Sequence, residues 1–525
     1  MGLGRFWWWV VLILVQFDTN GCFGCWEQEK AALLQIKSSI NSTTGIDYLQ
    51  TWNSTNKKSD CCDWERVKCD NTTGRTIQLD LSGIISWSRE DWCLNASLFL
   101  PFEELQYLDL EGNWISRWVP NEGFERFSML HKLEMLNLAN NGFNNNILSS
   151  VSGISSLKIL DLSENKLNGS FHIPGLCELR NLREISLYNN HLEGILPSCM
   201  LPMWMGNMSQ LTTIVMANNQ LEGPIPIELC KLFNLEFFDL SENNLFGLVP
   251  SCFNLSIIKF FHLNKNFFSG PIPNVFQNNS NLVTLNLRDN YLNGSIPDWI
   301  GRVSSLSILL LGANHLEGTN LRLKRQHLRI RNKRLAGEIP PELGKISNNL
   351  RAMNLSHNNL TGPIPTSISN LKQMESLDLS YNNLNGTIPP QLTEMTSLEV
   401  FSVAHNNLSG TTPDRKNQFI TFEESSYEGN PLLCGPPLHN DCTKIGPAFT
   451  TPMDYEEEGG SFMDMSVFYI SFVVVYITVL LGIVAVLYIN PYWRRAWFNL
   501  IEVCIDTCYC FVVVHYCKLF KFRLA

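Results

Sequence analysis

The stretch Leu377-Asp378-Leu379-Ser380-Tyr381-Asn382-Asn383-Leu384-Asn385-Gly386-Thr387-Ile388-Pro389 contains the pattern that decides the fold. Leu377 and Leu379 alternate with polar residues, as in a short strand with one buried face. Asn382 follows where the chain is expected to bend inward. A buried amide there must hydrogen-bond the backbone of its own and the adjacent turns or cost roughly 1–3 kcal/mol. Gly386 and Pro389 fix backbone angles in the return segment, where larger side chains would crowd the next turn.

The same phrase recurs along most of the chain, at intervals of mostly 23 to 25 residues. One copy cannot bury its apolar face alone, so successive copies must stack into a solenoid. The sequence therefore predicts an α/β solenoid, a right-handed leucine-rich-repeat horseshoe or superhelix. The asparagines that mark its turns are Asn113, Asn141, Asn165, Asn190, Asn219, Asn243, Asn266, Asn290, Asn314, Asn358, Asn382 and Asn406.

Composition and motifs argue against a nucleic-acid-binding protein and against an enzyme. The formal net charge is −10, which disfavours a polyanionic partner. The sequence contains no Gly-x-Ser-x-Gly, no His-Glu-x-x-His and no Cys/His cluster with metal-ligand spacing. We therefore expect no catalytic residue, no metal site and no cofactor.

The two ends of the chain carry apolar segments of different length. Arg5 precedes the uncharged stretch 6–15, which is too short to cross a bilayer and is followed by small residues near position 24, so 1–24 is expected to be a secretory signal rather than a buried helix. The segment 467–489 has 23 consecutive uncharged residues, enough to cross a hydrocarbon core of ~30 Å as one helix. The alternative is a buried solenoid helix.

Charges around 467–489 predict the orientation. Acidic residues precede this segment and Arg494 and Arg495 follow it, which places the carboxyl end in the cytosol. The chain is thus expected to be a single-pass type I plasma-membrane protein with its amino terminus outside. Four tail cysteines are either palmitoylation sites or apolar residues against the membrane: Cys504, Cys508, Cys510 and Cys517.

The remaining cysteines fit an oxidising compartment. Cys61 and Cys62 are adjacent and should take different partners, with Cys25 and Cys69 the nearest candidates, although spacing leaves the connectivity open. Corresponding positions in successive return segments lie about 4.8 Å apart, within reach of a disulfide. This predicts the pairs Cys177–Cys199 and Cys230–Cys252, while Cys434 and Cys442 close a short loop and Cys93 has no obvious partner.

Thirteen Asn-x-Ser/Thr sequons lie on the side expected to be external, and none lies in the tail. The repeat phrase creates some of them by itself, so we expect roughly half to carry glycan. The acceptor residues are Asn41, Asn53, Asn71, Asn95, Asn168, Asn207, Asn254, Asn278, Asn293, Asn354, Asn359, Asn385 and Asn407.

Three motifs together resemble one family. The run Cys-Cys-Asp-Trp-Glu-Arg-Val-Lys-Cys at 61–69 looks like the amino-terminal cap of plant leucine-rich-repeat receptors, and 427–438 is similar to their carboxyl-terminal cap. The ending Leu-x-Gly-x-Ile-Pro, at 221–226, 292–297 and 384–389 among others, is typical of the plant-specific repeat subtype. A tail of 36 residues without kinase motifs makes the chain similar to the plant receptor-like proteins rather than to the receptor kinases.

This resemblance implies a cell-surface receptor that lacks its own kinase. Such proteins sense a peptide, protein, oligosaccharide, microbial or wall-derived ligand in defence or development, and signal through a receptor kinase, as adaptor or co-receptor, in the same membrane. Two alternatives remain open: an inhibitor of secreted cell-wall enzymes, which shares the cap and repeat subtype, and a signalling-incompetent decoy.

The decoy alternative arises from 319–340, where the pattern weakens. Leu328 and Ile330 keep the register of a repeat, but Lys333 stands where the marker asparagine should be, which predicts a degenerate coil. Relatives of this kind usually carry a non-repeat island near this place. Seven basic residues here form either an anion-binding patch or the solvated surface of a damaged coil: Arg322, Lys324, Arg325, Arg329, Arg331, Lys333 and Arg334.

Ligand contact is expected on the concave face of the strands, where outward positions have no packing role. Phe237 and Phe260 are outward aromatic residues on adjacent coils, which is uncommon unless a ligand, a glycan or a loop covers them. The candidate ligand-binding residues are Tyr107, Arg183, Tyr188, Phe237, Asp239, Phe260, His262 and Arg288.

The expected organisation follows from these segments. It is a signal peptide at 1–24, an amino-terminal cap at 25–75, repeats at 76–413 with the degenerate coil at 319–340, a carboxyl-terminal cap at 414–445, an acidic juxtamembrane spacer at 446–466, a transmembrane helix at 467–489 and a cytoplasmic tail at 490–525.

Overall fold

The structure is a computed structural model that describes residues 25–44, 47–53, 60–85, 93–119, 121–170, 179–196, 210–251, 257–317, 337–346 and 349–442. All of these residues belong to one compact unit, 1–446. The predicted signal peptide, spacer, membrane span and tail lie outside the described residues. None of the helices within the described ranges is both long and apolar enough to span a bilayer.

The amino-terminal cap covers the first coil. Its helix α2 (Glu27–Thr44) is followed by η1 (Cys61–Asp63) and by β1 (Val67–Cys69), which pairs antiparallel with β2 (Thr76–Asp80). Disulfides join Cys25 to Cys61 and Cys62 to Cys69, which settles the connectivity that spacing had left open. The cap thus supplies an edge strand that closes the first end of the main sheet.

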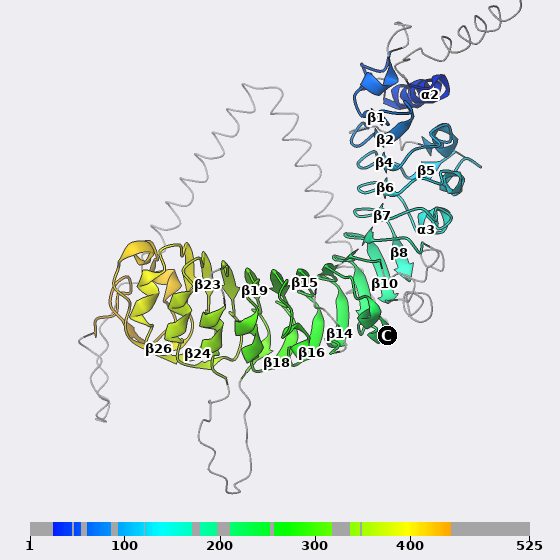
Figure 1. Ribbon diagram of the computed structural model, residues 1–525. Coiled ribbons are helices and arrows are strands. Elements are labelled where there is room, and N and C mark those ends of the chain that lie inside the picture. Colours follow the sequence, from blue (N-terminus) through cyan, green and yellow to red (C-terminus); the bar gives the residue numbers. More distant parts are fainter. Residues whose placement is uncertain are drawn as a thin grey trace, which may run out of the picture. The chain divides into compact units, whose positions relative to one another are not determined.

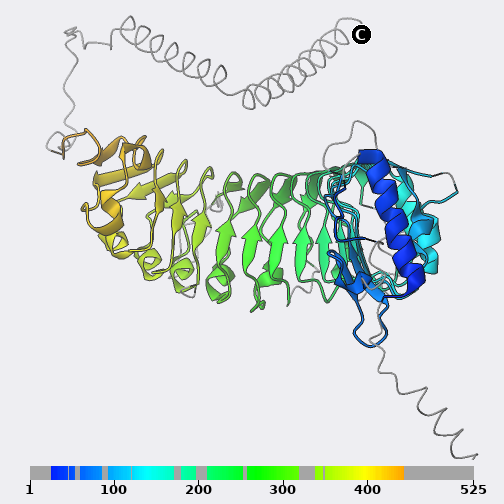
Figure 2. The same cartoon turned by 90° about the horizontal axis from the view of Figure 1, so that it is seen from above.

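A fourteen-stranded sheet runs through the repeats, with one short strand from each coil and parallel pairing from β2 onward (Figures 1 and 2). Its central residues point into the core: Leu285 and Leu377, for example, are fully buried. After β2 its strands are β4 (Tyr107–Asp109), β6 (Met135–Asn137), β7 (Ile159–Asp161), β9 (Glu184–Ser186), β11 (Thr213–Val215), β13 (Phe237–Asp239), β15 (Phe260–His262), β17 (Thr284–Asn286), β19 (Ile308–Leu310), β21 (Ala352–Asn354), β23 (Ser376–Asp378) and β25 (Val400–Ser402).

Smaller parallel sheets form after the bend in each coil. The seven-stranded second sheet contains β8 (Asn168–Ser170), β10 (His191–Ile195), β12 (Gln220–Gly223), β14 (Asn244–Leu248), β16 (Phe267–Gly270), β18 (Tyr291–Gly294) and β20 (His315–Leu316). A four-stranded sheet contains β22 (Thr361–Gly362), β24 (Asn383–Gly386), β26 (Asn407–Thr411) and β27 (Leu432–Cys434), and a two-stranded one contains β3 (Cys93–Leu94) and β5 (Arg117–Trp118).

Short helices complete the return segments, and six of those named below directly follow the Pro of the repeat phrase, which fixes an extended residue before the turn. Pro365, for example, has φ −64° and ψ 131° just before its helix. The helices are η2 (Ala96–Phe99), η3 (Phe124–Met129), α3 (Asn146–Val151), η6 (Ile227–Lys231), η7 (Asn274–Phe276), η8 (Asp298–Arg302), η9 (Pro341–Lys345), η10 (Thr366–Asn370), η11 (Pro390–Glu394), η12 (Asn417–Ile420) and η13 (Glu424–Ser426).

The predicted asparagine ladder is confirmed. Asn382 Nδ2 donates to the carbonyl oxygen of Leu355 in the preceding coil at 3.0 Å and to that of Leu379 in its own coil at 3.1 Å. Its Oδ1 accepts from the Leu360 N–H at 3.0 Å. Every hydrogen-bonding group of the amide is therefore used to join two coils. The ladder also extends one rung beyond the sequence prediction, to Asn430 in the carboxyl-terminal cap.

The degenerate coil predicted at 319–340 falls largely outside the described residues, which end at Glu317 and resume at Gly337. β19 pairs in register with β21, with Leu309 opposite Met353, so no strand lies between them. Asn314 and Asn358 are consecutive rungs, since the Leu316 N–H donates to Asn358 Oδ1 at 2.9 Å. A coil needs its own place in the main sheet, and here β21 occupies that place.

The return segment of this coil resumes at Gly337. The Thr361 N–H donates to the carbonyl oxygen of Gly337 at 2.8 Å, and Glu338 bridges to Thr361. Joined across the gap, Asn314-His315-Leu316-Glu317 and Gly337-Glu338-Ile339-Pro340 spell one complete repeat phrase. Residues 318–336 lie outside the described ranges, and the residues on either side of them, Glu317 and Gly337, belong to one return segment.

The other cysteine predictions have mixed outcomes. A disulfide joins Cys434 to Cys442, as predicted, and Cys93 is an exposed free cysteine. Cys230 is disulfide-bonded, while its predicted partner Cys252 lies outside the described residues. Cys177 and Cys199 also lie outside them, so that pair stays a prediction.

Candidate ligand-binding face

Outward side chains of the main sheet form two columns, because residues at i and i+2 of a strand share a face and the parallel strands are in register. Phe237 lies opposite Phe260 in one column, and Asp239 lies opposite His262 in the other. Of the predicted ligand-binding residues, these four come together in a single cluster across β13 and β15, which we call the Phe-His cluster.

The aromatic rings of the Phe-His cluster contact one another. The Phe237 and Phe260 centroids lie 5.3 Å apart at an interplanar angle of 38°, and the His262 ring stands nearly edge-on to Phe237 at 5.7 Å. The three side chains are partly buried. The cluster therefore presents a preorganised apolar surface on a face of otherwise mostly polar residues.

Asp239 and His262 supply the polar part of the cluster. His262 Nδ1 lies 3.5 Å from Asp239 Oδ2. Burial of the Asp239 carboxyl disfavours its charge, but hydrogen bonds from His262 and from Ser241 outweigh that effect and hold the pKa of Asp239 below its usual value. The other ring nitrogen, His262 Nε2, is buried and has no hydrogen-bond partner in the described part of the chain. It is thus a polar atom that a ligand group could satisfy.

A shallow pocket of about 320 Å³ lies just before the strands β9 to β13. Its lining includes Arg183 and Glu236, and Glu236 is paired with Lys259 at 2.6 Å. Arg183 is exposed, and within the described ranges its guanidinium makes no ion pair. Sequence reasoning found Arg183 but not the pocket, because Glu236 and Thr212 come from different coils. The remaining lining residues are Gln210, Asn234 and Ile257.

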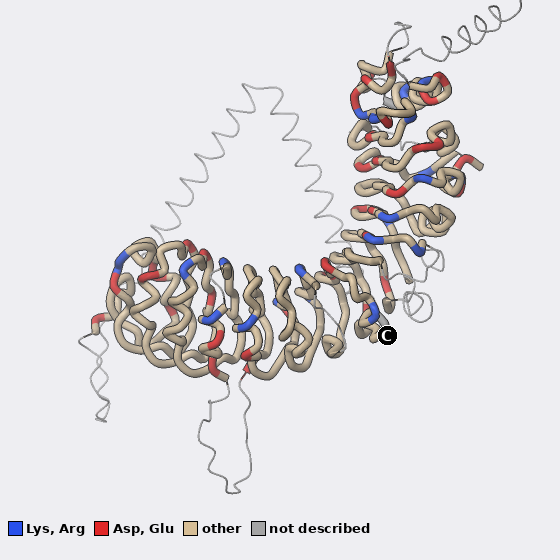
Figure 3. Tube along the Cα trace, in the orientation of Figure 1, with Lys and Arg blue, Asp and Glu red and all other residues tan. Residues whose placement is uncertain are grey.

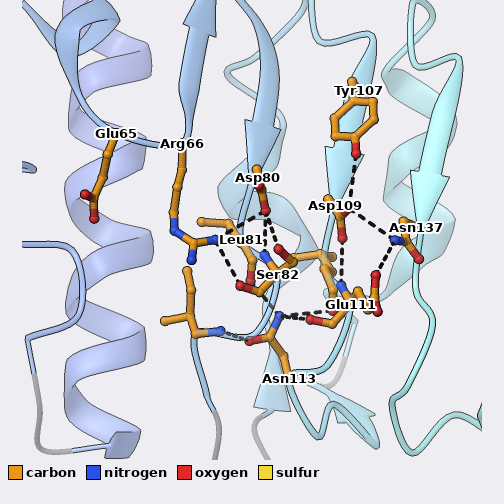
Figure 4. Close-up of polar contacts among 12 residues, drawn as sticks. Glu65, Arg66, Asp80, Leu81, Ser82, Tyr107, Asp109, Glu111, Asn113 and Asn137 are labelled. Atoms are coloured by element: carbon orange, nitrogen blue, oxygen red, sulfur yellow. Dashed lines mark hydrogen bonds and ion pairs between the residues drawn. The ribbon is translucent and has the colours of Figure 1, made fainter.

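Tyr107 has a different environment from the Phe-His cluster (Figure 4). Its hydroxyl donates to Asp109 Oδ2 at 3.1 Å, and Asn137 Nδ2 donates to the same carboxylate at 3.1 Å and to Glu111 at 3.0 Å. Burial, together with the charge of Asp109, raises the pKa of Tyr107 to about 12. These groups satisfy one another, so Tyr107 is a poorer candidate for ligand contact than its outward position indicates.

The last two predicted residues lie in the bends that follow the strands. Tyr188 is 40% exposed. Arg288 is exposed and its Nε lies 3.0 Å from Asp289 Oδ2. Neither residue joins the Phe-His cluster.

Charged residues of neighbouring coils pair along the repeats, so basic and acidic positions are interspersed (Figure 3). Lys158 contacts Glu134 at 2.6 Å, and Lys265 contacts Glu242 at 3.0 Å. These pairs are exposed, and each contributes little to stability. They neutralise the flanks of the strand face and leave Arg183 as an uncompensated positive charge beside it.

Family models match several parts of the chain. The model described as "Leucine rich repeat N-terminal domain" matches residues 27–70, and leucine-rich-repeat models match 181–203, 210–232, 234–255, 281–303, 326–384 and 348–408. The first match covers α2 and the Cys62–Cys69 disulfide of the cap.

Curated relatives carry one recurring description. Receptor-like protein 9b of Arabidopsis thaliana is 38% identical over 189 residues, which cover 36% of this chain and 20% of the relative. Putative receptor-like protein 8 of the same plant is 34% identical over 257 residues, covering 48% and 24%. Cuscuta receptor 1 of Solanum lycopersicum is 35% identical over 253 residues, covering 43% and 21%.

Over these parts, the chain is similar to the plant leucine-rich-repeat receptor-like proteins. Its matches span about a fifth to a quarter of the length of these relatives.

Two solved structures share the solenoid of this chain. The crystal structure of PEPR1–AtPEP1 matches with a TM-score of 0.55 and 26% identity, covering 74% of this chain and 53% of that one. The plant peptide hormone receptor RGFR1 in complex with RGF2 matches with a TM-score of 0.52 and 29% identity, covering 64% and 53%.

Proposed function

We propose that this receptor-like protein is a cell-surface receptor that binds an extracellular ligand on the outward face of its main sheet. The observation that carries the proposal is the Phe-His cluster, which combines partly exposed aromatic rings with the unsatisfied Nε2 of His262. Rigid aromatic side chains next to a buried polar group that lacks a partner are the features of a binding hot spot.

The cluster and the neighbouring pocket specify a ligand chemistry. An apolar or aromatic group would pack on Phe237 and Phe260, a hydrogen-bonding group would reach His262 Nε2, and a carboxylate would pair with Arg183. A peptide offers all three groups in an extended form. The receptors PEPR1 and RGFR1 were solved with AtPEP1 and RGF2, which supports a peptide; a microbial or wall-derived ligand with the same groups would also fit.

The remaining parts of the chain complete the proposal. Segment 1–24 directs secretion, 467–489 anchors the protein in the plasma membrane, and 490–525 is the cytoplasmic tail. A receptor kinase in the same membrane provides the output, in defence or in development.

Alanine at both Phe237 and Phe260 tests the binding site. Loss of two anchoring side chains should weaken ligand binding at least tenfold, which is about 1.4 kcal/mol. Candidate peptides would be screened by binding to the solubilised protein and by co-precipitation of a receptor kinase. The matched control is alanine at Phe246, which is 52% exposed on the second sheet and should leave binding unchanged. Equal affinity of the double variant and the wild type would overturn the assignment.

A further inference from the structure

Exposed aromatic side chains also form a row on the second sheet, away from the Phe-His cluster. Phe267, Tyr291 and His315 occupy the same position in three consecutive coils, immediately after the ladder asparagine. The Tyr291 centroid lies 5.9 Å from that of Phe267 and 5.6 Å from that of His315, and the rings are close to parallel. Phe267 is 45% exposed and Tyr291 48% exposed.

These spacings leave ring surface open. Carbon atoms in full contact lie about 3.5–4.0 Å apart, so centroids that are farther apart belong to rings that overlap only in part. The same type of stack at His357, Tyr381 and His405 has centroids 4.2 Å apart, as expected for rings that do cover one another. The row on the second sheet is thus an apolar surface that its own members do not cover.

One sequon opens directly onto this surface. Asn293, in Asn293-Gly294-Ser295, is exposed on β18 two residues after Tyr291, so both side chains leave the same face of the strand. In the neighbouring strand, His315 is the register partner of Asn293. The acceptor amide is therefore flanked by one ring along its strand and by another across the sheet, at separations of about 5–7 Å.

We propose that Asn293 carries an N-linked glycan whose first N-acetylglucosamine packs on the aromatic row at Tyr291 and His315. The C–H groups on one face of this sugar and its acetyl methyl group are apolar and slightly positive, which suits the negative face of an aromatic ring. Transfer from a lipid pyrophosphate-linked oligosaccharide forms the bond from Asn293 Nδ2 to C1 of the sugar. It breaks the C1–O bond to the pyrophosphate, which leaves as the lipid pyrophosphate, and the amide loses one proton.

The chain contains its own reference site. Asn385 is an exposed sequon asparagine at the same position of β24, two residues after Asn383 instead of a tyrosine. Its register partner is Asn407 in place of a histidine. A glycan at Asn385 would thus stand on a polar surface and extend into solvent, whereas the glycan at Asn293 would lie on the sheet.

The consequence is a division of the solenoid surface. The sugar would shield the apolar row from protein partners and leave the main-sheet face, with its Phe-His cluster, as the open one. This inference rests on the proposed function in one respect: the chain must enter the secretory pathway to meet the glycan donor.

The test compares glycan release at two sites in one molecule. The full-length protein would be expressed in human cells, solubilised, and treated under native conditions with peptide N-glycosidase while mass spectrometry follows each glycopeptide. A contact worth about 1 kcal/mol should slow release at Asn293 roughly fivefold relative to Asn385. Tyr291→Asn, which reproduces the Asn385 surroundings, should bring the ratio to about one, and Tyr291→Phe should retain the protection.

The other possible results distinguish a failure of the glycan inference from a failure of the proposed receptor function. If Asn293 is unmodified while Asn385 is modified, the proposed packing of the sugar on the aromatic row is wrong, but entry into the secretory pathway is still supported. The same holds for a modified Asn293 whose release is unaffected by Tyr291→Asn. Absence of glycan at every sequon would instead contradict the secretory route, and with it the proposed receptor.

Discussion

The Leu316 N–H donates to Asn358 Oδ1 at 2.9 Å, across 42 positions of sequence, whereas the equivalent bond from Leu292 to Asn314 spans 22. Both bonds join consecutive coils. Residues 318–336, which lie between Glu317 and Gly337 and outside the described ranges, make up 19 of the 20 extra positions.

Deletion of 318–336 should therefore leave the solenoid intact. The join restores the repeat phrase from Asn314 to Pro340, and no described hydrogen bond between coils is lost. We expect secretion and a thermal midpoint within a few degrees of wild type. Removing the 19 residues from Leu292 to Leu310 instead takes out β18 to β19 and should abolish folding. Unfolding of the first variant would mean that 318–336 does form a coil.

Gly301 lies where the helix η8 packs against the helix η9 of the next coil. A Cβ at this position would lie 2.2 Å from the carbonyl oxygen of Glu342, because η8 and η9 pack directly against each other. Gly301→Ala should destabilise the protein by about 1–3 kcal/mol in urea unfolding. Arg302→Ala, an exposed neighbour in the same helix, should change stability by less than about 0.5 kcal/mol. An unchanged midpoint for Gly301→Ala would show that η9 is not seated there.

The asparagine ladder predicts that alanine substitutions at two adjacent asparagines differ greatly in their effect on stability. Asn382→Ala leaves the Leu360 N–H buried without a partner and removes one of the two amide donors to the Leu355 carbonyl, which should cost about 1–3 kcal/mol. Asn383→Ala, at an exposed strand position, should be nearly neutral. Denaturant unfolding of both variants measures the contrast, and similar midpoints would refute the structural role of the ladder.

The lowered pKa of Asp239 predicts that the stability of the folded chain falls at acidic pH. An Asp in the unfolded chain has a pKa of about 3.9, and the folded-state pKa of Asp239 is lower, so the folded chain binds fewer protons at this site. Its contribution is fully present above the unfolded pKa and is lost as pH falls through the folded pKa. Asp239→Asn should flatten the decline of the thermal midpoint below about pH 4.

His262→Gln gives the matching test. It removes the largest effect that lowers the pKa of Asp239, so the folded-state pKa moves toward the unfolded value and the loss of stability on acidification should be smaller than in wild type. If the profiles of both variants coincide with wild type, the Asp239–His262 contact does not exist in solution.

Much of the fold followed from the local phrase, because each Leu and each marker Asn has the same neighbours in every coil. The order of the strands around residues 318–336 did not. Leu328 and Ile330 have the spacing of a repeat, and only the pairing of β19 with β21 shows that these two strands are neighbours in the main sheet.

The candidate site was predicted in part for a similar reason. Alternation along a strand placed Phe237 and His262 outward, but it could not show that Asp109 is buried by its neighbours or that the Tyr107 hydroxyl is already bonded. The pocket beside Arg183 and the aromatic row at Tyr291 depend on side chains from several coils. No single repeat contains that information.

The final rung at Asn430 has a consequence for shortened forms of the chain. Its amide donates to the Val403 carbonyl at 3.0 Å and accepts from the Leu408 N–H at 3.0 Å. A product that stopped upstream of this residue would end in an exposed edge strand with unpaired backbone N–H and C=O groups. These groups could pair with a second molecule end to end. Truncation upstream of Asn430 should thus yield filaments or precipitates rather than a shorter soluble protein.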